Sequence, residues 1–294
     1  MTSRERILAA IDGLPHDHIP LTTWCFGFPA PAGLRWQRHA REIEHWYSMR
    51  MEHIHTIPQG WQLSDDFQRV QAWLSLGIDD VIDVSLPWSI DPRVSWQDSA
   101  RRGAGNSVEL VREYDTPSGK LVHAVRKTED DQAQGWVQPN KVPLFEDFNI
   151  PRATEHAVNS PRDVPLIEHL YQPPDEAART RFAVRMQDVK AFSDQNGVAV
   201  QAWSGFGMDA VVWLAGTEGA IMLAMDHPRD FSRLMEIITQ TDLGRTELAA
   251  TTPGVDIIVC RGWYSGMDFW SPGLFDEFVY SYVEKLAAIA HRHG

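Results

Sequence analysis

The hydrophobic and polar positions of this chain follow two periods in turn, one typical of helices and one typical of strands. Short β-branched runs bounded by turn residues predict buried strands. We expect strands at residues 18–24, 81–86, 198–203 and 255–260. Because helical patterns separate these runs, the sequence favours an α/β fold with a mainly parallel sheet.

Capping residues mark where the expected helices begin. Thr2 and Glu5 form a capping-box pattern, which predicts a first helix that ends near Gly13. Ser271 as N-cap, followed by Pro272, predicts the start of the last helix. Further helices are expected at residues 38–57, 64–77, 175–196, from 208 onward and at 228–250, with a short one that Ser160 caps.

Residues 108–128 interrupt the alternation of helices and strands. Apolar residues alternate on both sides of the turn-forming segment 115–119, which predicts an inserted antiparallel β-hairpin. A closed (β/α)₈ barrel needs eight parallel strands, and we expect only four. The predicted fold class is therefore α/β of the TIM-barrel type, an incomplete barrel with the first four βα units, in one domain that spans residues 1–294.

The composition is acidic, with 27 Lys+Arg against 40 Asp+Glu and a formal net charge of −13. This charge disfavours nucleic acids and anionic membranes as partners, because their phosphates bind Lys and Arg. The first residues lack the apolar region of a signal peptide, and no long apolar run occurs, so we expect a cytoplasmic protein. Two cysteines, Cys25 and Cys260, are too few for a disulfide framework or a cysteine-rich zinc site.

Four of the 12 tryptophans lie at or just after the expected strand ends: Trp24, Trp88, Trp203 and Trp263. Ligands of parallel α/β folds bind at the C-terminal ends of the strands. Four indoles around one mouth would suit an aromatic or macrocyclic ligand. The alternative is that they only cover loops above the sheet. The expected substrate-binding set also includes four neighbouring residues: Cys25, Ser85, Ser204 and Tyr264.

Residues 205–210 match the G-x-G-x-x-A fingerprint of dinucleotide-binding proteins. The acidic residue that this fingerprint requires further along falls on Asp226, at what reads as a helix start rather than a strand end. A tight strand-to-helix turn explains the glycines better, so a nicotinamide-dependent oxidoreductase is the least favoured function. Backbone N–H groups at this helix start would still suit a ligand carboxylate or phosphate.

Histidines suggest a metal at three places, which are His16/His18, His53/His55 and Glu42/His45. Positions i and i+2 of a helix point to different faces, and one Glu-x-x-His lacks the partner helix of a di-iron site. We interpret these histidines as solvated surface residues and assign no metal ligand.

Two further residue types are candidates for chemistry. Asp83 lies inside an expected strand, where it faces either the barrel interior or the helices, and Asp268 lies in the loop after the fourth expected strand. Cys260 sits in an apolar strand and is interpreted as a small buried residue, whereas Cys25 at a strand end is the better reactive candidate.

Both ends of the chain resemble the uroporphyrinogen decarboxylase superfamily. The resemblance rests on residues 3–13 with 17–21 near the start, and on residues 271–278 with Tyr282 and 291–294 near the end. It implies a TIM barrel, which agrees with the four expected strands.

The resemblance to the decarboxylases of this superfamily is weak at the site. Their arginine-rich loop after the first strand is replaced here by residues 25–30, with no arginine before Arg35. Their essential aspartate falls on or near Ser85, with Asp83 the nearest carboxylate, and their tyrosine falls near Val212. Only the serine after the fourth strand has a counterpart, Ser265. A polycarboxylate substrate needs guanidinium partners, so decarboxylation is disfavoured.

The methyltransferase branch of the superfamily is a better match, through residues 114–121 and 159–163. This resemblance implies transfer of a methyl group to or from a corrinoid or a thiol, with a corrinoid protein as a partner. It also implies zinc, but the zinc motif would lie on a strand expected after Gly294 and is not in this chain. The predicted catalytic residues are Ser265, Asp268 and Asp83.

Three functions therefore stay open. The favoured one is a methyltransferase-type enzyme that binds a small-molecule or macrocyclic ligand. The second is a uroporphyrinogen decarboxylase with an altered site. The third is a non-catalytic binding or scaffold protein, a half barrel whose exposed strand edges pair with another chain or a second copy.

Overall fold

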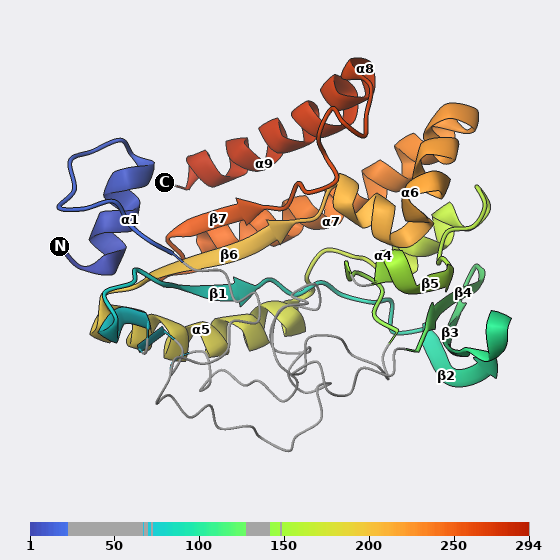
Figure 1. Cartoon of the computed structure of the whole chain (residues 1–294), viewed down its shortest axis with the longest axis horizontal. Helices are drawn as coiled ribbons and strands as arrows, with labels where there is room; N and C mark the ends of the chain where they lie inside the picture. The colour runs from blue at the N-terminus through green and yellow to red at the C-terminus, as the bar shows by residue number, and fades with distance from the viewer. Residues whose placement is uncertain (23–66, 68–69, 72, 128–141, 148, 294) are drawn as a thin grey trace.

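A computed structural model describes residues 1–22, 67, 70–71, 73–127, 142–147 and 149–293 (Figure 1). Several predictions lie outside the described residues. They are the helix at 38–57, part of the helix at 64–77, the end of the strand at 18–24, and the residues Trp24, Cys25, Glu42, His45, His53 and His55. Residues 18–22 are described and form a bend and loop rather than a strand. Residues 70–71 and 73–75 are helical, as expected.

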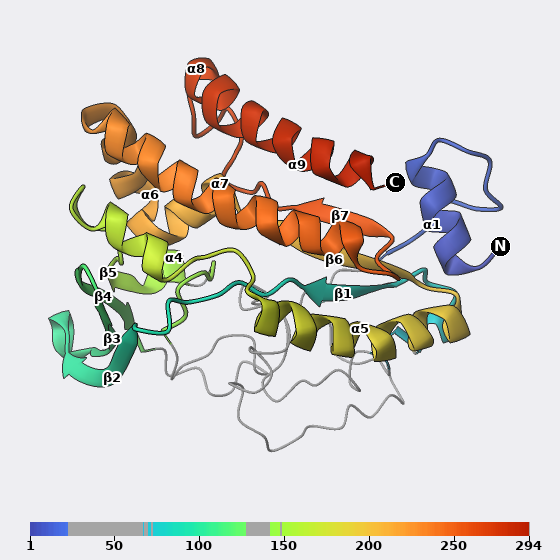
Figure 2. The same cartoon turned by 180° about the vertical axis from the view of Figure 1, so that it is seen from behind.

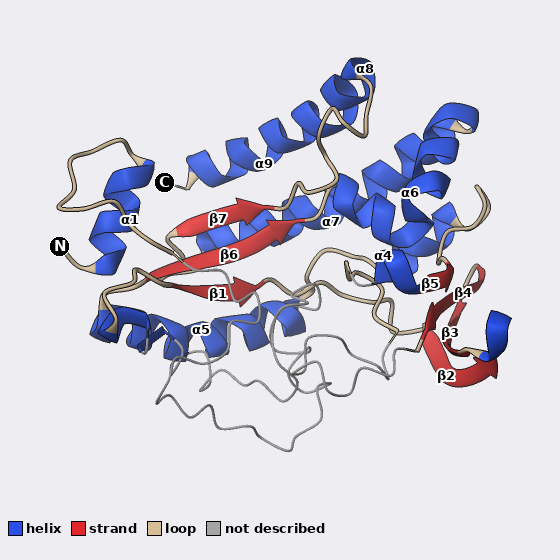
Figure 3. Ribbon diagram, in the orientation of Figure 1, coloured by secondary structure: helices blue, strands red, loops and turns tan. Residues whose placement is uncertain are grey.

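Three parallel strands form the centre of the fold. They are β1 (Val81–Ser85), β6 (Ala199–Gly205) and β7 (Ile257–Cys260), in the order β1-β6-β7. They confirm the strands predicted at 81–86, 198–203 and 255–260. The described strands form an open sheet and not a closed barrel (Figure 3).

Two long helices cover one face of this sheet. They are α5 (Glu176–Asn196) and α7 (Pro228–Thr251), both close to their predicted ranges (Figure 2). Alternate strand residues point toward these helices and share one apolar core with them: Ile82, Val84, Val200, Ala202 and Ile258. Asp175 caps α5 at its start, and Gly197 ends it in the left-handed conformation with φ 63°.

The opposite face of the sheet carries the other alternate residues. The helix α1 (Ser3–Ile11) lies at the N-terminal ends of the strands, where Ile7 packs on Val81 and Ala199 (Figure 1). The predicted capping box between Thr2 and Glu5 is present. Beyond α1, the described residues leave this face open to a hollow.

A second, antiparallel sheet lies beyond the C-terminal ends of the parallel strands (Figure 1). The predicted hairpin is confirmed as β3 (Val108–Thr116) and β4 (Gly119–Arg126). Sequence reasoning missed β2 (Ser95–Arg102), because all eight of its residues are exposed and no apolar alternation marks it. The edge strand β5 (Ala153–Glu155) completes this sheet, and a short 3₁₀ helix, η1 (Ala104–Asn106), joins β2 to β3.

Shorter helices surround the strand ends. They are α4 (Asn149–Arg152), the 3₁₀ helix η2 (Val164–His169), α8 (Pro272–Leu274), the π-helix η3 (Phe275–Tyr280) and α9 (Ser281–Arg292). Ser271 caps the last helical segment as predicted, with its Oγ 3.4 Å from the Leu274 nitrogen.

The short helix expected from Ser160 begins later, at Val164. The Ser160 hydroxyl donates to Asp163 at 3.1 Å instead of accepting from a helical N–H group. Asp163 also accepts from the backbone nitrogens of Asn159 and Ser160. These bonds hold the segment as a turn, and Asp163 becomes the residue before the helix.

The helix α6 (Met208–Asp226) follows β6 and is the most apolar of the described helices. Among the described residues it is the single helix long and apolar enough to cross a membrane, but 67% of its apolar stretch is buried inside the fold. It is broken at Gly216, whose φ of 72° is left-handed. A side chain there would collide with His156, since a Cβ would lie 2.3 Å from the imidazole Nε2.

One buried carboxylate joins the sheet to its helices. Asp242 of α7 accepts hydrogen bonds from the Phe206 and Gly207 nitrogens at 2.9 and 3.1 Å, and from the hydroxyls of Tyr171 and Tyr282. Its ion-pair partner Arg245 is equally buried. A buried charge needs all of these partners, because without them the free-energy cost of removing the charge from water would not be offset.

We predict that Asp242→Ala lowers the free energy of unfolding by about 3–5 kcal/mol, because it leaves the buried Arg245 charge without its carboxylate. The matched control is Glu236→Ala on the same helix. Its exposed pair with Arg233 contributes less than about 1 kcal/mol. Urea unfolding followed by circular dichroism measures both, and equal losses for the two variants would contradict the prediction.

Candidate functional site

The face of the parallel sheet opposite α5 and α7 lines a hollow of about 780 Å³ among the described residues. Its floor comes from the three strands, one end from α1, and its rim from the residues that follow β7. The lining residues are Ile7, Ile11, Thr22, Val81, Asp83, Gln201, Trp203, Ile257, Val259, Cys260, Arg261, Gly262 and Trp263. This volume lies in the range of small-ligand sites.

Asp83 is the carboxylate in the floor of the hollow. It is 6% exposed and accepts a hydrogen bond from the Trp203 indole Nε1 at 3.0 Å and another from the Gln201 side-chain amide. The strand register explains this contact, because Asp83 of β1 lies beside Gln201 of β6. Of the two directions that the sequence left open for Asp83, the structure shows the one toward the hollow and away from α5 and α7.

Trp203 and Trp263 both line this hollow. Trp203 is nearly buried at 7% exposure, whereas Trp263 keeps 41% of its surface exposed. The guanidinium of Arg261 lies 4.1 Å from the Trp263 ring centroid and 4.8 Å from that of Trp213, so it stacks between two indoles. The exposed tryptophan is thus held in place by a buried cation.

Arg261 is in turn held by two carboxylates. Its Nε donates to Asp209 at 2.8 Å, and its Nη2 donates to Asp147. Asp209 also accepts from the backbone nitrogens of Trp263 and Tyr264 at 3.1 and 2.8 Å. Burial raises the pKa of Asp209, while Arg261 and these hydrogen bonds act in the opposite direction. This cluster fixes the loop after β7 on the first turn of α6.

Trp88 does not line the hollow. Its ring packs edge to face against Phe145, Tyr171 and Phe206, with Arg245 at 5.6 Å. Of the four tryptophans predicted around one mouth, the structure brings Trp203 and Trp263 together and places Trp88 in an aromatic cluster beside the strand ends. Trp24 lies outside the described residues.

The other predicted binding residues are dispersed. Ser85 lies at the C-terminal end of β1, buried, and its hydroxyl has no hydrogen-bond partner among the described residues. The buried Ser204 hydroxyl lies 3.4 Å from the Val259 carbonyl oxygen, within the sheet. The Tyr264 ring packs against Phe269, and burial raises the pKa of the Tyr264 hydroxyl. Ser85 is the one of these three whose polar group the fold leaves unused.

The three predicted catalytic residues lie in three different places. Asp83 is in the floor of the main hollow. Ser265 lines a second hollow of about 380 Å³, between the end of β7 and the helices that follow it, together with Cys260 and Tyr282. Asp268 is exposed and lines neither hollow. The described structure therefore brings no two of them into one site.

Cys260 contributes to both hollows but is a poor nucleophile. Burial, the largest cause, raises the pKa of its thiol to about 12, and the negative charge of Asp242 adds to this effect. Because the thiolate is the reactive form, Cys260 is inert at neutral pH. The thiol is half-buried rather than fully buried, which differs slightly from the prediction of a small buried residue.

The glycine motif at residues 205–210 has a structural role. The nitrogens of Phe206 and Gly207 donate to Asp242, so a carboxylate of the chain itself occupies the place suggested for a ligand anion. Gly207 has a φ of 49°, and a Cβ there would lie 2.7 Å from the Tyr282 ring. Asp226 ends α6 instead of starting a helix. The expectation of an anion site here is wrong.

Metal binding finds no support in the described residues, which contain no group of three His, Cys, Asp or Glu side chains able to hold an ion. His16 and His18 are exposed, as predicted, and His18 lies 3.5 Å from both Asp17 and Asp79. The zinc implied by the methyltransferase resemblance does not fit the described part of the chain.

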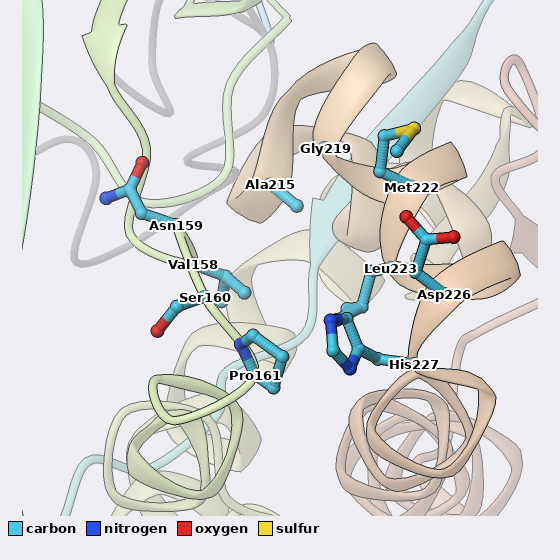
Figure 4. A pocket seen from close by; sticks show the side chains of 10 residues that line it. All are labelled: Val158, Asn159, Ser160, Pro161, Ala215, Gly219, Met222, Leu223, Asp226 and His227. Carbon is cyan, nitrogen blue, oxygen red and sulfur yellow. The ribbon is translucent and has the colours of Figure 1, made fainter.

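A third, smaller hollow of about 280 Å³ lies between residues 158–161 and the C-terminal half of α6 (Figure 4). The polar side chains of Asn159 and Ser160 on one wall bond to His156 and Asp163. Asp226 and His227 lie on the opposite wall and are exposed. This hollow lacks the indoles and the buried carboxylate of the main one.

Sequence reasoning missed Gln201, Arg261, Asp209 and Asp147 as part of the site. Arg261 carried a usable signal, because it is a charged residue directly after a short apolar strand. Asp147 carried none, since only the tertiary fold brings it to Arg261, 114 positions away.

Comparisons with known proteins give one similarity. No protein-family profile matches the chain, and no curated protein sequence matches it. Among solved structures, a methyltransferase from Methanosarcina mazei is similar with a TM-score of 0.48 and 14% sequence identity, over 99% of this chain and 67% of that one. At this level, no residue of that protein's site carries over to this chain.

We predict that Cys260 resists thiol reagents in the folded protein. A pKa of about 12 instead of 9.0 lowers the thiolate fraction at pH 8 by about 1000-fold. The reaction of a Cys25→Ser variant with a disulfide reagent measures this, and the same variant in urea is the control that should react at the ordinary rate. Rapid modification of the folded variant at pH 8 would refute the prediction.

Proposed function

We propose that this chain is a methyltransferase-type protein similar to the uroporphyrinogen decarboxylase superfamily, and that the hollow on the open sheet face binds a small methyl-bearing ligand. The observation that carries the proposal is the hollow itself, which joins two indoles and a buried carboxylate on one face. The sequence resemblance supplies the reaction class. The hollow supplies a place of suitable size and chemistry.

The arrangement of the sheet supports the barrel-type fold as part of this proposal. The strands β1, β6 and β7 are parallel and follow one another in chain order. Their apolar outer residues face α5 and α7, and their inner residues line the hollow. TIM barrels have the same division between helix-facing and inward-facing residues. We therefore propose that these strands are successive βα units of an incomplete barrel.

The contents of the hollow favour a small ligand. Its volume of about 780 Å³ is typical of small-molecule sites. The indoles of Trp203 and Trp263 suit a planar or methylated group. We assign the hollow to the small methyl-bearing compound, and we propose that a corrinoid, where one takes part, belongs to a partner protein that approaches the rim.

Activation of a methyl acceptor needs groups other than those described. The described residues provide no zinc site, and the Cys260 thiol stays protonated near neutral pH. What the described residues do is bind and orient. Asp83 fixes the Trp203 indole, and Arg261 fixes the Trp263 indole.

Uroporphyrinogen decarboxylation is the weaker alternative. Among the described residues that line the hollow, Arg261 is the one cation, and Asp147 and Asp209 already bind it. A polycarboxylate ligand would therefore find no guanidinium partner in this lining.

A scaffold function has its own supporting observation. In the described sheet β7 is an edge strand, and all four of its residues are half-buried. Such an edge can pair with a strand of a second chain. Size-exclusion chromatography of the whole chain tests this alternative, since a stable monomer argues against edge pairing.

We predict that an aryl methyl ether such as anisole quenches the tryptophan fluorescence of the full chain. Trp263→Leu should weaken this binding by about 10-fold, because it removes an aromatic contact from the rim. Trp96→Leu is the matched control. Trp96 is 49% exposed on β2 with Arg112 at 5.6 Å from its ring, yet it lies outside the hollow.

Calorimetry measures whether the chain binds a cobalamin, which is the corrinoid expected to exchange the methyl group in the proposed reaction. The proposed function fails if the folded chain binds neither the aryl ether nor the cobalamin. Release of carbon dioxide from uroporphyrinogen would instead establish the decarboxylase alternative.

A further inference from the structure

We propose that Ser118, His169 and Asp91 form a second site, in which Ser118 is a nucleophile that accepts the acyl group of small carboxylic esters. The inference is independent of the proposed methyl transfer, because none of these three residues lines the hollow on the parallel sheet. A chain of two hydrogen bonds carries it. The Ser118 Oγ lies 2.9 Å from the His169 Nε2, and the His169 Nδ1 lies 3.0 Å from a carboxylate oxygen of Asp91.

Three separate segments of the chain supply this site. Ser118 lies in the turn between β3 and β4, His169 is the last residue of η2, and Asp91 lies between β1 and β2. The two hydrogen bonds join residues that are 51 and 78 positions apart. No local pattern in the sequence marks such a site, so only the tertiary structure shows it. The order serine, histidine, aspartate is that of hydrolase triads, which recur on unrelated folds.

The backbone holds the histidine and the aspartate against each other. The Asp91 nitrogen donates to the His169 carbonyl oxygen at 2.8 Å. Beside this bond, the backbones of Ser89 and Gln172 exchange two hydrogen bonds of 2.9 and 3.0 Å. The histidine and the aspartate are only 7% and 5% exposed. The imidazole therefore has little freedom to turn away from the carboxylate.

The hairpin turn that carries the serine packs on the same 3₁₀ helix. A Cβ at Gly119 would lie 3.2 Å from the Leu166 side chain, which is tighter than an ordinary contact. Within the turn, the Thr116 hydroxyl donates to the Gly119 carbonyl oxygen at 2.7 Å and accepts from the Ser118 nitrogen at 3.3 Å. Ser118 itself is exposed. The nucleophile is thus held beside its base on a part of the surface that solvent reaches.

The neighbouring charges determine which nitrogen of His169 carries the proton. The Arg93 guanidinium donates to both carboxylate oxygens of Asp91, at 2.9 and 2.6 Å, and these bonds lower the pKa of Asp91 well below its ordinary value. An ionised carboxylate only accepts, so the His169 Nδ1 is the protonated nitrogen and Nε2 is an acceptor. The Ser118 hydroxyl therefore donates to Nε2, as a general base requires.

The reaction balances with these groups and water alone. The Ser118 Oγ attacks the ester carbonyl carbon and its proton passes to the His169 Nε2. The ester C–O bond then breaks, and the alcohol leaves with that proton. Water attacks the acyl-serine and gives a proton to Nε2, and Ser118 recovers this proton as the carboxylic acid leaves. An ester suits the site better than an amide, because an alcohol leaves more readily than an amine.

The test uses a fluorophosphonate, which reacts with activated serines when the P–O bond forms and fluoride leaves. We expect the folded full chain to be modified at Ser118 at least about 100-fold faster than at Ser99, measured by mass spectrometry of its peptides. Ser99 is the matched control, an exposed serine of the same sheet that lies opposite Val111. Ser118→Ala should also lower the release of p-nitrophenolate from p-nitrophenyl acetate, whereas Ser99→Ala should not.

Two further variants test the roles of the partners. His169→Ala should slow the modification of Ser118 by about 100-fold, and added imidazole should restore part of this rate by acting as the base. Asp91→Asn tests the positioning residue. Arg93 would bind the asparagine oxygen, so the amide NH₂ group would face His169 and the ring proton would move to Nε2. We expect this variant to react about 10-fold more slowly or less, with the altered ring proton visible in nitrogen NMR spectra.

Two results would overturn the inference. One is modification of Ser118 no faster than of Ser99 in the folded chain, and the other is an equal rate in the full chain and in His169→Ala. Either result would show that the hydrogen bond from Ser118 only fastens the hairpin turn to η2. Neither result bears on the binding of anisole or cobalamin, so this proposal and the proposed function fail separately.

Discussion

The fold depends on a single buried carboxylate, Asp242. It accepts from two backbone nitrogens at the end of β6 and from two tyrosine hydroxyls, and it pairs with Arg245. Arg245 donates in turn to the carbonyl oxygens of Leu86 and Trp203, at the ends of β1 and β6. One ion pair thus connects α7 with two strand ends, with Tyr171 just after η2, and with α9. A charge so buried is stable only when every partner is present, which makes the arrangement specific.

A second buried ion cluster lies nearer the hollow, and it likewise pairs a buried arginine with carboxylates from distant segments. Arg261 lies between Asp147 and Asp209 and between the indoles of Trp213 and Trp263. It connects the segment after the antiparallel insertion, the start of α6 and the loop after β7. At the rim of the hollow, two carboxylates therefore neutralise the Arg261 guanidinium, and this guanidinium holds the exposed Trp263 indole in a fixed position. Preorganisation of this kind lowers the cost of binding a ligand.

Local patterns predicted most of the described secondary structure. Apolar β-branched runs predicted β1, β6 and β7, and turn residues predicted the hairpin of β3 and β4. The pattern failed for β2, since an exposed strand has no apolar face to mark it. It also failed at Ser160, where a nearby aspartate accepted the hydroxyl hydrogen bond and made a turn. The sequence placed tryptophans near strand ends, but it gave no means to tell that Trp88 packs into a core cluster and Trp203 lines a hollow.

The sequence by itself determined the acidic charge, which depends on composition alone. It also determined the α/β class, the parallel strands and the caps of α1 and α8, because each of these depends on neighbours within a few positions. The tertiary structure decided which residues form a site. It turned Asp83 toward the hollow and brought Asp147 to Arg261. It also placed the Asp242 carboxylate where the backbone nitrogens of the glycine motif donate to it. These contacts join residues far apart in the chain, and their energies depend on burial, which no local pattern encodes.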